Sequence, residues 1–144
     1  MILLDAFAVV ALLADEPAGQ DVAEMIDAGQ CAVSAVNLVE AADVLERSHG
    51  ITTAETRAAV TTLTDAPLQI LDVDERRAWR AAEVRAGFYR RRGAEISVAD
   101  CILLATARPG LDAIATPDPP VLRIAGQLGI DVIPLLDSSG RRPR

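Results

Sequence analysis

Two aspartates stand directly after short apolar runs, at positions where a strand would end. Asp5 follows the run 2–4, and Asp118 follows the run 113–116 after a single proline. Ligands of parallel α/β sheets bind beyond the carboxyl ends of the strands, so both side chains are candidate ligands. The alternative is that each one caps the helix that follows, and the two prolines after Asp118 are typical of a capped helix.

Glu40 is an acidic residue on an otherwise apolar helical stripe. In the helix expected to begin at Ser34, it shares this stripe with Val36, Asp43 and Val44. A carboxylate beside apolar neighbours needs a partner, because burying an unpaired charge is costly. Glu40 is therefore a candidate ligand, although its side chain could instead reach solvent. Asp43, one turn further on, is a competing candidate.

Asp100 lies at the start of a strongly apolar helix. It follows the expected N-cap, Ser97, by three residues and precedes the apolar run 101–104. A capping box is one explanation, although that motif prefers Glu or Gln, whose longer side chains reach back to the cap amide. An aspartate at the mouth of so apolar a helix is the fourth candidate ligand.

Together, the four carboxylates Asp5, Glu40, Asp100 and Asp118 suit a hard divalent cation. Carboxylates brought together repel one another and titrate as a coupled set, and a divalent ion relieves this repulsion. The chain has no lysine and a single histidine, which excludes lysine-dependent catalysis and multi-histidine zinc sites. Oxygen ligands favour Mg²⁺ or Mn²⁺, and such ions activate water and stabilise charge on a phosphodiester.

The elements that would position these residues alternate between strand and helix. The expected strands span residues 2–4, 31–33, 68–73, 113–116 and 132–135. The expected helices span residues 6–13, 19–28, 34–49, 52–65, 74–92, 97–107 and 121–128. Strands regularly separated by helices predict an α/β fold with a central parallel sheet and helices on its faces.

Length and composition indicate one globular domain. The chain has 144 residues, 51% of them hydrophobic, and we expect a domain over 1–136 followed by a flexible polar tail, 137–144. The longest apolar run, 6–14, is shorter than the roughly 20 residues that span a bilayer, so no membrane span is expected. Without a secretory signal, we expect a cytoplasmic location. Both cysteines, Cys31 and Cys101, lie in apolar runs and should be buried and reduced.

The order and spacing of the acidic segments resemble the PIN-domain ribonucleases, most specifically the VapC toxins of bacterial toxin–antitoxin pairs. Residues 1–5 (Met-Ile-Leu-Leu-Asp) resemble the opening strand and first metal aspartate, and residues 34–40 (Ser-Ala-Val-Asn-Leu-Val-Glu) resemble the helix that carries the glutamate. Residues 96–107 (Ile-Ser-Val-Ala-Asp-Cys-Ile-Leu-Leu-Ala-Thr-Ala) resemble the family's most recognisable segment. Residues 115–118 (Ala-Thr-Pro-Asp) resemble the Thr-x-Asp that supplies the last acid.

This resemblance implies a PIN-like three-layer α/β/α fold and an Mg²⁺-dependent endoribonuclease, for which Mn²⁺ may substitute. Asp5, Glu40, Asp100 and Asp118 would hold the ion or ions and activate water. The resemblance also implies a cognate VapB-like antitoxin as partner, an RNA substrate and a homodimer. An arginine of the antitoxin could enter the acidic site, while an amphipathic helix fills a groove.

Arginines and aromatic residues are concentrated in the expected helix 74–92. Arg76, Arg77, Arg80 and the run 90–92 could hold RNA, or they could form a solvated helix face paired with Glu75 and Glu83. The net charge of −7 disfavours binding of nucleic acid over the whole surface but leaves room for such a local patch. Trp79, with Ala82, Ala86 and Tyr89, has the spacing of a buried stripe, so we expect it to pack in the core rather than to stack on bases.

Two other functions are alternatives to a ribonuclease. A haloacid-dehalogenase-type phosphatase would need an acid at position 7, where Phe7 stands, and a lysine that the chain lacks. A degenerate PIN module that only binds RNA or a protein is the stronger alternative. It draws support from Phe7, which replaces a hydroxyl residue common in the family, and from the two prolines that could redirect Asp118. The single histidine, His49, suits a helix C-terminus, and we assign it no catalytic role.

Overall fold

A five-stranded parallel sheet forms the centre of the molecule. The computed structural model describes residues 1–64, 67–89 and 95–143. The strands are β1 (Ile2–Leu4), β2 (Cys31–Ser34), β3 (Leu68–Leu71), β4 (Ala113–Thr116) and β5 (Asp131–Pro134). They pair in the order β3-β2-β1-β4-β5, and all four pairings are parallel. β1 therefore lies in the middle of the sheet, with β2 and β4 as its direct neighbours.

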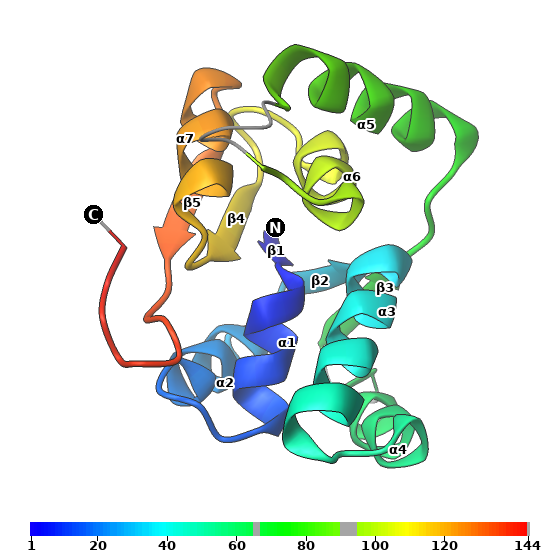
Figure 1. Cartoon of the computed structure of the whole chain (residues 1–144), viewed down its shortest axis with the longest axis vertical. Helices are drawn as coiled ribbons and strands as arrows, with labels where there is room; N and C mark the ends of the chain where they lie inside the picture. The colour runs from blue at the N-terminus through cyan, green and yellow to red at the C-terminus, as the bar shows by residue number, and fades with distance from the viewer. Residues whose placement is uncertain (65–66, 90–94, 144) are drawn as a thin grey trace.

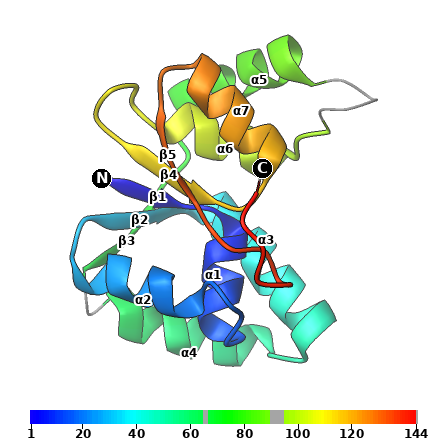
Figure 2. The same cartoon turned by 90° about the vertical axis from the view of Figure 1, so that its left-hand side faces the viewer.

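Helices cover both faces of this sheet and complete the expected three-layer α/β/α fold (Figures 1 and 2). The helices are α1 (Ala6–Leu13), α2 (Gly19–Asp27), α3 (Ala35–Val44), α4 (Thr53–Thr64), α5 (Glu75–Phe88), α6 (Val98–Thr106) and α7 (Pro119–Gln127). A π-helical segment, η1 (Leu45–His49), continues α3. In Figure 2, α5, α6 and α7 lie on one side of the sheet, and α1, α2 and α4 lie on the other.

Alternation along the strands divides the hydrophobic core into two clusters. Leu3 and Ile114 pack with α5, α6 and α7, whereas Leu4 and Ala115 pack with α1 and α2. Successive side chains of a strand point to opposite faces, so each strand contributes to both clusters. Strands buried on both faces explain why the sequence shows short continuous apolar runs rather than alternating ones.

Local signals in the sequence set most helix ends. Ser34, Asp74 and Ser97 accept hydrogen bonds from the backbone amides of the helices that they precede, as N-caps do. The predicted stop after His49 is confirmed, because Gly50 has a φ of 69°, a left-handed conformation that glycine adopts without strain.

The helix α5 differs from its prediction in length and in its buried face. It ends at Phe88 rather than near residue 92, and residues 90–94 lie outside the described part of the chain. Its buried residues are Ala81 and Val84, with Phe88 packed beside them, so the predicted core position of Trp79 is wrong. Trp79 is 66% exposed, because α5 packs on α6 through a different stripe.

Three further expectations concern the cysteines, the membrane and the tail. Cys31 and Cys101 are buried free thiols, as expected. Within the described residues, no helix is long and apolar enough to cross a membrane. In the tail, Asp137 accepts backbone hydrogen bonds from Ser139 and Arg141, which form a turn. The flexibility of residues 137–144 stays a prediction.

Candidate functional site

Three of the four predicted acids meet in one cluster. Asp5 follows β1, Glu40 lies on α3, and Asp100 lies in the first turn of α6. Each offers a carboxylate oxygen, and these oxygens all lie within 4.8 Å of one another. Asp5 and Asp100 are buried, with exposed fractions of 5% and 9%. Glu40 and Asp100 lie 35 and 95 positions after Asp5 in the chain, and the fold makes both its neighbours.

The parallel register explains how the chain brings these groups together. Leu4 pairs with Val33 on one side and with Ala115 on the other, so β1, β2 and β4 end at the same edge of the sheet. α3 follows β2 directly from this edge and carries Glu40 in its second turn. α6 packs beside α3 and begins at the same edge, which places Asp100 opposite Glu40.

Asp118 lines the same pocket but stands apart from the three-acid cluster. The pocket has a volume of about 530 Å³, and Asp5, Glu40, Asp100 and Asp118 all line it. Burial, and next the charge of Asp100, raise the pKa of Asp118 to about 6. The prolines that begin α7 have therefore not turned Asp118 away from the pocket. Phe7 also lines the pocket.

Capping of a helix does not account for the side chains of Asp5 and Asp118. Both residues occupy N-cap positions, of α1 and α7, but within the described chain neither side chain makes the capping hydrogen bond. Instead, Asp5 Oδ2 accepts a 2.5 Å hydrogen bond from the Thr116 hydroxyl. The same hydroxyl oxygen accepts a hydrogen bond from the Asp118 amide at 3.1 Å. Thr116 thereby holds the ends of β1 and β4 in a common arrangement.

For Asp100, capping and clustering occur together. Its Oδ2 accepts a hydrogen bond from the Ser97 amide at 2.6 Å, and Ser97 Oγ accepts one from the Asp100 amide at 3.0 Å, which completes a capping box. The Ser97 hydroxyl also hydrogen bonds Glu40. The cap therefore fixes the orientation of Asp100 and links it to a second acid of the cluster.

The hydroxyls of Ser97 and Thr116 were not predicted to organise the site. Ser97 was recognised only as a cap, and Thr116 only as part of a resembling segment. Thr116 is fully buried at the end of a strand whose other residues are apolar, and a lone hydroxyl in such a place is the signal that points to this role. For Ser97, no local signal predicts the contact with Glu40, which depends on how α3 packs against α6.

Asp43, the competing candidate on α3, lies outside the cluster. It is exposed and forms an ion pair with Arg47, one turn along the helix. Glu40 is half-buried and lines the acidic pocket. The rotation of α3 about its axis separates these two acids, because residues three apart on a helix differ by about 60° in direction.

Without a bound ion, the surroundings of the site disfavour the ionised forms of its carboxyl groups. Burial, and to a smaller extent the charge of Asp100, raise the pKa of Asp5 to about 7, although the hydrogen bond from Thr116 acts in the opposite direction. Burial and the charge of Asp100 also raise the pKa of Glu40. These shifts, together with a donor set made only of carboxylate oxygens, fit a hard divalent cation such as Mg²⁺.

His49 and Glu16 form a pair at the same pocket. His49 lies at the end of η1, as predicted for a helix C-terminus, and its Nε2 lies 3.4 Å from Glu16 Oε1. Both residues line the acidic pocket, and Glu16 was not predicted to do so. The other oxygen of Glu16 is buried and has no hydrogen-bond partner among the described residues.

Among the described residues, none of the predicted arginines lines this pocket. Arg76, Arg77 and Arg80 lie on α5, and the run 90–92 lies outside the described residues. The alternative pairing with Glu75 and Glu83 is also not observed where the structure describes the chain. Arg77 pairs with Asp74, and Glu75 accepts a hydrogen bond from Trp79.

Comparison with known proteins identifies the class that this fold and site define. The sequence model of the PIN domain matches residues 2–126, which is most of the chain. The chain belongs to the PIN-domain family. PIN domains are generally nucleases. Among curated proteins, none matches the chain significantly.

Solved structures support the same fold. The chain resembles one in a toxin–antitoxin complex from Klebsiella pneumoniae, with 18% identity, a TM-score of 0.64 and coverage of 92% of this chain and 96% of the other. It resembles one in VapBC2 from Rickettsia felis bound to a promoter DNA fragment, with 17% identity, a TM-score of 0.67 and coverage of 94% and 99%. It also resembles one in FitAcB from Neisseria gonorrhoeae, with 23% identity, a TM-score of 0.62 and coverage of 92% and 96%. At these identities, the likeness concerns the fold.

Proposed function

We propose that this protein is a metal-dependent endoribonuclease and the toxin of a toxin–antitoxin pair. The observation that carries the proposal is the cluster of Asp5, Glu40 and Asp100, whose carboxylate oxygens converge within 4.8 Å in an open pocket. Nothing in the packing of the core requires three acids at one point, and their mutual repulsion opposes folding unless a cation is bound. The resemblance of the fold to the toxin–antitoxin structures supports the biological role.

The residues of the chain would divide the work as follows. Asp5, Glu40 and Asp100 would hold Mg²⁺ or Mn²⁺, and Ser97 and Thr116 would orient their carboxylates by the hydrogen bonds described above. A bound divalent ion would supply activation of water and stabilisation of the charge that develops on the phosphodiester. Asp118, which lines the same pocket beside the cluster, would accept a proton from the attacking water.

A cleavage assay with matched variants tests this proposal. The purified chain should cleave single-stranded RNA with Mg²⁺ or Mn²⁺, lose the activity in EDTA and regain it when the ion is restored. Asp100→Asn should reduce cleavage to the level of the chelated sample. Asp43→Asn, which removes an exposed acid from α3, should cleave as the wild type does. Equal activity of the wild type and Asp100→Asn in parallel preparations would mean that the cleavage does not come from the acidic cluster, as with a contaminating nuclease. That result would contradict the proposal.

A groove beside the site supports an antitoxin as the partner. Leu38, Val39, Val60 and Ile70 line a mainly apolar groove of about 420 Å³ between α3 and α4. Val39 and Ile70 are 69% and 42% exposed and line the same groove, so they form an apolar patch rather than isolated surface residues. An amphipathic antitoxin helix would fill this groove, and an arginine from the same segment would enter the acidic pocket on the other side of α3.

Growth assays test the antitoxin proposal. Expression of the chain alone should stop growth, and co-expression of a small protein encoded beside it should restore growth. Val39→Glu should abolish the rescue without reducing cleavage of RNA, whereas Leu111→Glu, a matched change at an exposed apolar residue elsewhere, should leave the rescue intact. A chain that is soluble, loaded with metal and harmless would contradict the toxin role. We also propose that the protein is cytoplasmic and that it forms a homodimer. The mass of the protein in solution would test the homodimer.

The second candidate function is a binding module without catalysis. Phe7 favours it, because this residue lines the pocket where a hydroxyl would otherwise stand close to the metal. The same cleavage assay separates the two functions, since a binding module would bind RNA or its partner with no metal-dependent cleavage.

A further inference from the structure

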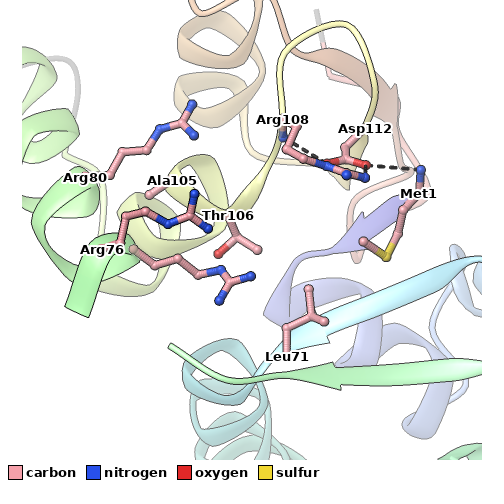
Figure 3. Close-up of a pocket in the computed structure, with 9 residues that line it drawn as sticks. Met1, Leu71, Arg76, Arg80, Ala105, Thr106, Arg108 and Asp112 are labelled. Carbon is pink, nitrogen blue, oxygen red and sulfur yellow. Dashed lines mark hydrogen bonds and ion pairs between the residues drawn. The ribbon is translucent and has the colours of Figure 1, made fainter. Parts of the chain in front are cut away.

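A second pocket, rich in arginine, lies at the other end of α6 from the acidic cluster. It has a volume of about 320 Å³, and Arg76, Arg77 and Arg80 of α5 line it together with Arg108, which follows α6. Figure 3 shows the guanidinium groups of Arg76 and Arg80 extending from α5 toward Thr106 and the Arg108–Asp112 pair. Four of the 14 basic residues of an otherwise acidic chain therefore meet in one cavity.

Internal partners neutralise only part of this positive charge. Arg108 donates to Asp112 through Nε at 2.8 Å, and the amino group of Met1 lies 3.3 Å from the same carboxylate. Arg77 pairs with Asp74 at 3.1 Å. Arg76 and Arg80 have no hydrogen bond or ion pair to any described residue. Within the described chain, two guanidinium groups at the cavity thus have no compensating partner.

The arrangement is unfavourable for the protein by itself. Arg76 and Arg80 are four residues apart on one helix, and like charges at this spacing destabilise a helix. Arg76 also lies in the first turn of α5, where the positive end of the helix dipole disfavours a cation. The C-terminal end of α6 supplies only about half of one negative charge to the cavity. A bound anion would relieve this repulsion.

We propose that this arginine pocket binds phosphate groups of single-stranded RNA, the substrate of the proposed function on which this inference rests. Guanidinium groups bind phosphate oxygens in a bidentate manner, and two of them are available here. Trp79 lies on α5 within one turn of both free arginines and is 66% exposed, so a base next to the bound phosphate can stack on its ring. This aromatic neighbour favours a nucleic acid over an acidic protein segment.

The length of α6 relates the two sites. Asp100 lies in its first turn and Thr106 is its last residue, so the acidic cluster and the arginine pocket are separated along the helix by six residues, or about 9 Å. Stacked nucleotides rise about 3.4 Å each, so about three nucleotides cover this distance. A strand of a few nucleotides therefore has the length to reach from the arginine pocket to the acidic cluster at the other end of this buried helix.

Binding measured in EDTA tests this inference without requiring catalysis. A short fluorescein-labelled single-stranded RNA would be titrated with the wild type, with the double variant Arg76→Ala/Arg80→Ala and with the control Arg47→Ala/Arg57→Ala. The control removes the same charge from exposed arginines of η1 and α4. Thermal melting of each protein would establish that the variants are folded.

The expected result is a change in the dependence of binding on salt. Each phosphate contact to a single strand contributes about 0.7 to the slope of log Kobs against log salt, so the double variant should lose about 1.4. Raising salt from about 50 to 200 mM should then weaken binding of the wild type about sevenfold more than that of the double variant. The control should keep the slope of the wild type. RNA should also quench the fluorescence of Trp79, the single tryptophan.

Several outcomes would overturn the inference. One is an equal slope for the wild type and the double variant. Another is competition by inorganic phosphate at this pocket with no effect of the variant on RNA, which would indicate a small-anion site. A third is loss of binding to oligoglutamate but not to RNA, which would indicate an acidic protein ligand. If the slope changes as expected while Asp100 proves dispensable for cleavage, the proposed function fails and the arginine site stands.

Discussion

Replacing Asp5 by asparagine should stabilise the protein in the absence of metal. Burial, acting against the Thr116 hydrogen bond, raises the pKa of Asp5 from 3.8 to about 7. This difference of about 3 pKa units, at about 1.36 kcal/mol per unit, corresponds to about 4 kcal/mol by which the Asp5 charge lowers the free energy of unfolding at neutral pH. Asparagine removes the charge but still has to bury an amide, so we expect a gain of about 2 kcal/mol.

The difference in stability between Asp5→Asn and the wild type should depend on pH. The folded-state pKa of Asp5 is raised, so its contribution to stability is complete below about pH 4 and is lost as the pH rises toward 7. Asparagine does not ionise, so the stability of the Asp5→Asn variant does not fall over this pH range for this reason. Its advantage over the wild type should therefore be absent near pH 4 and grow through the window up to pH 7.

Thermal unfolding in EDTA and in Mg²⁺ is the appropriate assay. A gain of about 2 kcal/mol corresponds to a rise in Tm of about 6 °C in EDTA at neutral pH. In Mg²⁺, the wild type should gain RT ln(1 + [L]/Kd), about 2.7 kcal/mol at 100 times Kd, and the variant much less. Asp43→Asn serves as the control for loss of an exposed acid. A variant that is less stable than the wild type in EDTA, or equally stabilised by Mg²⁺, would refute the assignment of Asp5 as a buried metal ligand.

Three further substitutions test individual contacts of the structure. Asp112→Asn should lower the free energy of unfolding by about 1–3 kcal/mol in urea melts at neutral pH, because Arg108 holds the pKa of this buried acid below 3.8, and the difference should shrink as the pH falls below about 4. Thr116→Val removes the hydroxyl bonded to Asp5, so Mg²⁺-induced stabilisation should require a pH about one unit higher. Gly19→Ala places a Cβ 2.6 Å from a carbonyl oxygen of α1 and should cost about 1–3 kcal/mol, whereas Gly126→Ala meets nothing within 4 Å and should not destabilise.

The sequence was sufficient to predict the order of the elements and which acids line one pocket. The apolar runs 2–4 and 113–116, followed by Asp5 and, after one proline, by Asp118, predicted the strands and the edge at which these two acids lie. Ser97 and Gly50 predicted helix ends correctly, because caps and left-handed glycines depend on interactions within a few residues. The absence of lysine and the single histidine limited the chemistry before any fold was considered.

Only the tertiary structure decided between neighbouring residues on the same helix. Both Glu40 and Asp43 fit the pattern on α3, and the rotation of that helix against α6 turns one into the pocket and leaves the other in solvent. Trp79 has the spacing of a core residue, yet α5 packs through Ala81 and Val84. Periodicity shows that a helix has a buried face, but the packing angle between two helices selects which face it is.

The same limit applies to contacts between distant segments. The hydrogen bond from Thr116 to Asp5 spans 111 residues, and the arginine pocket joins α5 with Arg108, which follows α6. No local pattern predicts either contact. The first depends on the register of the strands, and the second depends on how α5 packs against α6. The sequence by itself thus determined which acids and arginines were available and on which elements they lie. The tertiary structure decided which of them meet, because convergence depends on contacts between residues that are far apart along the chain.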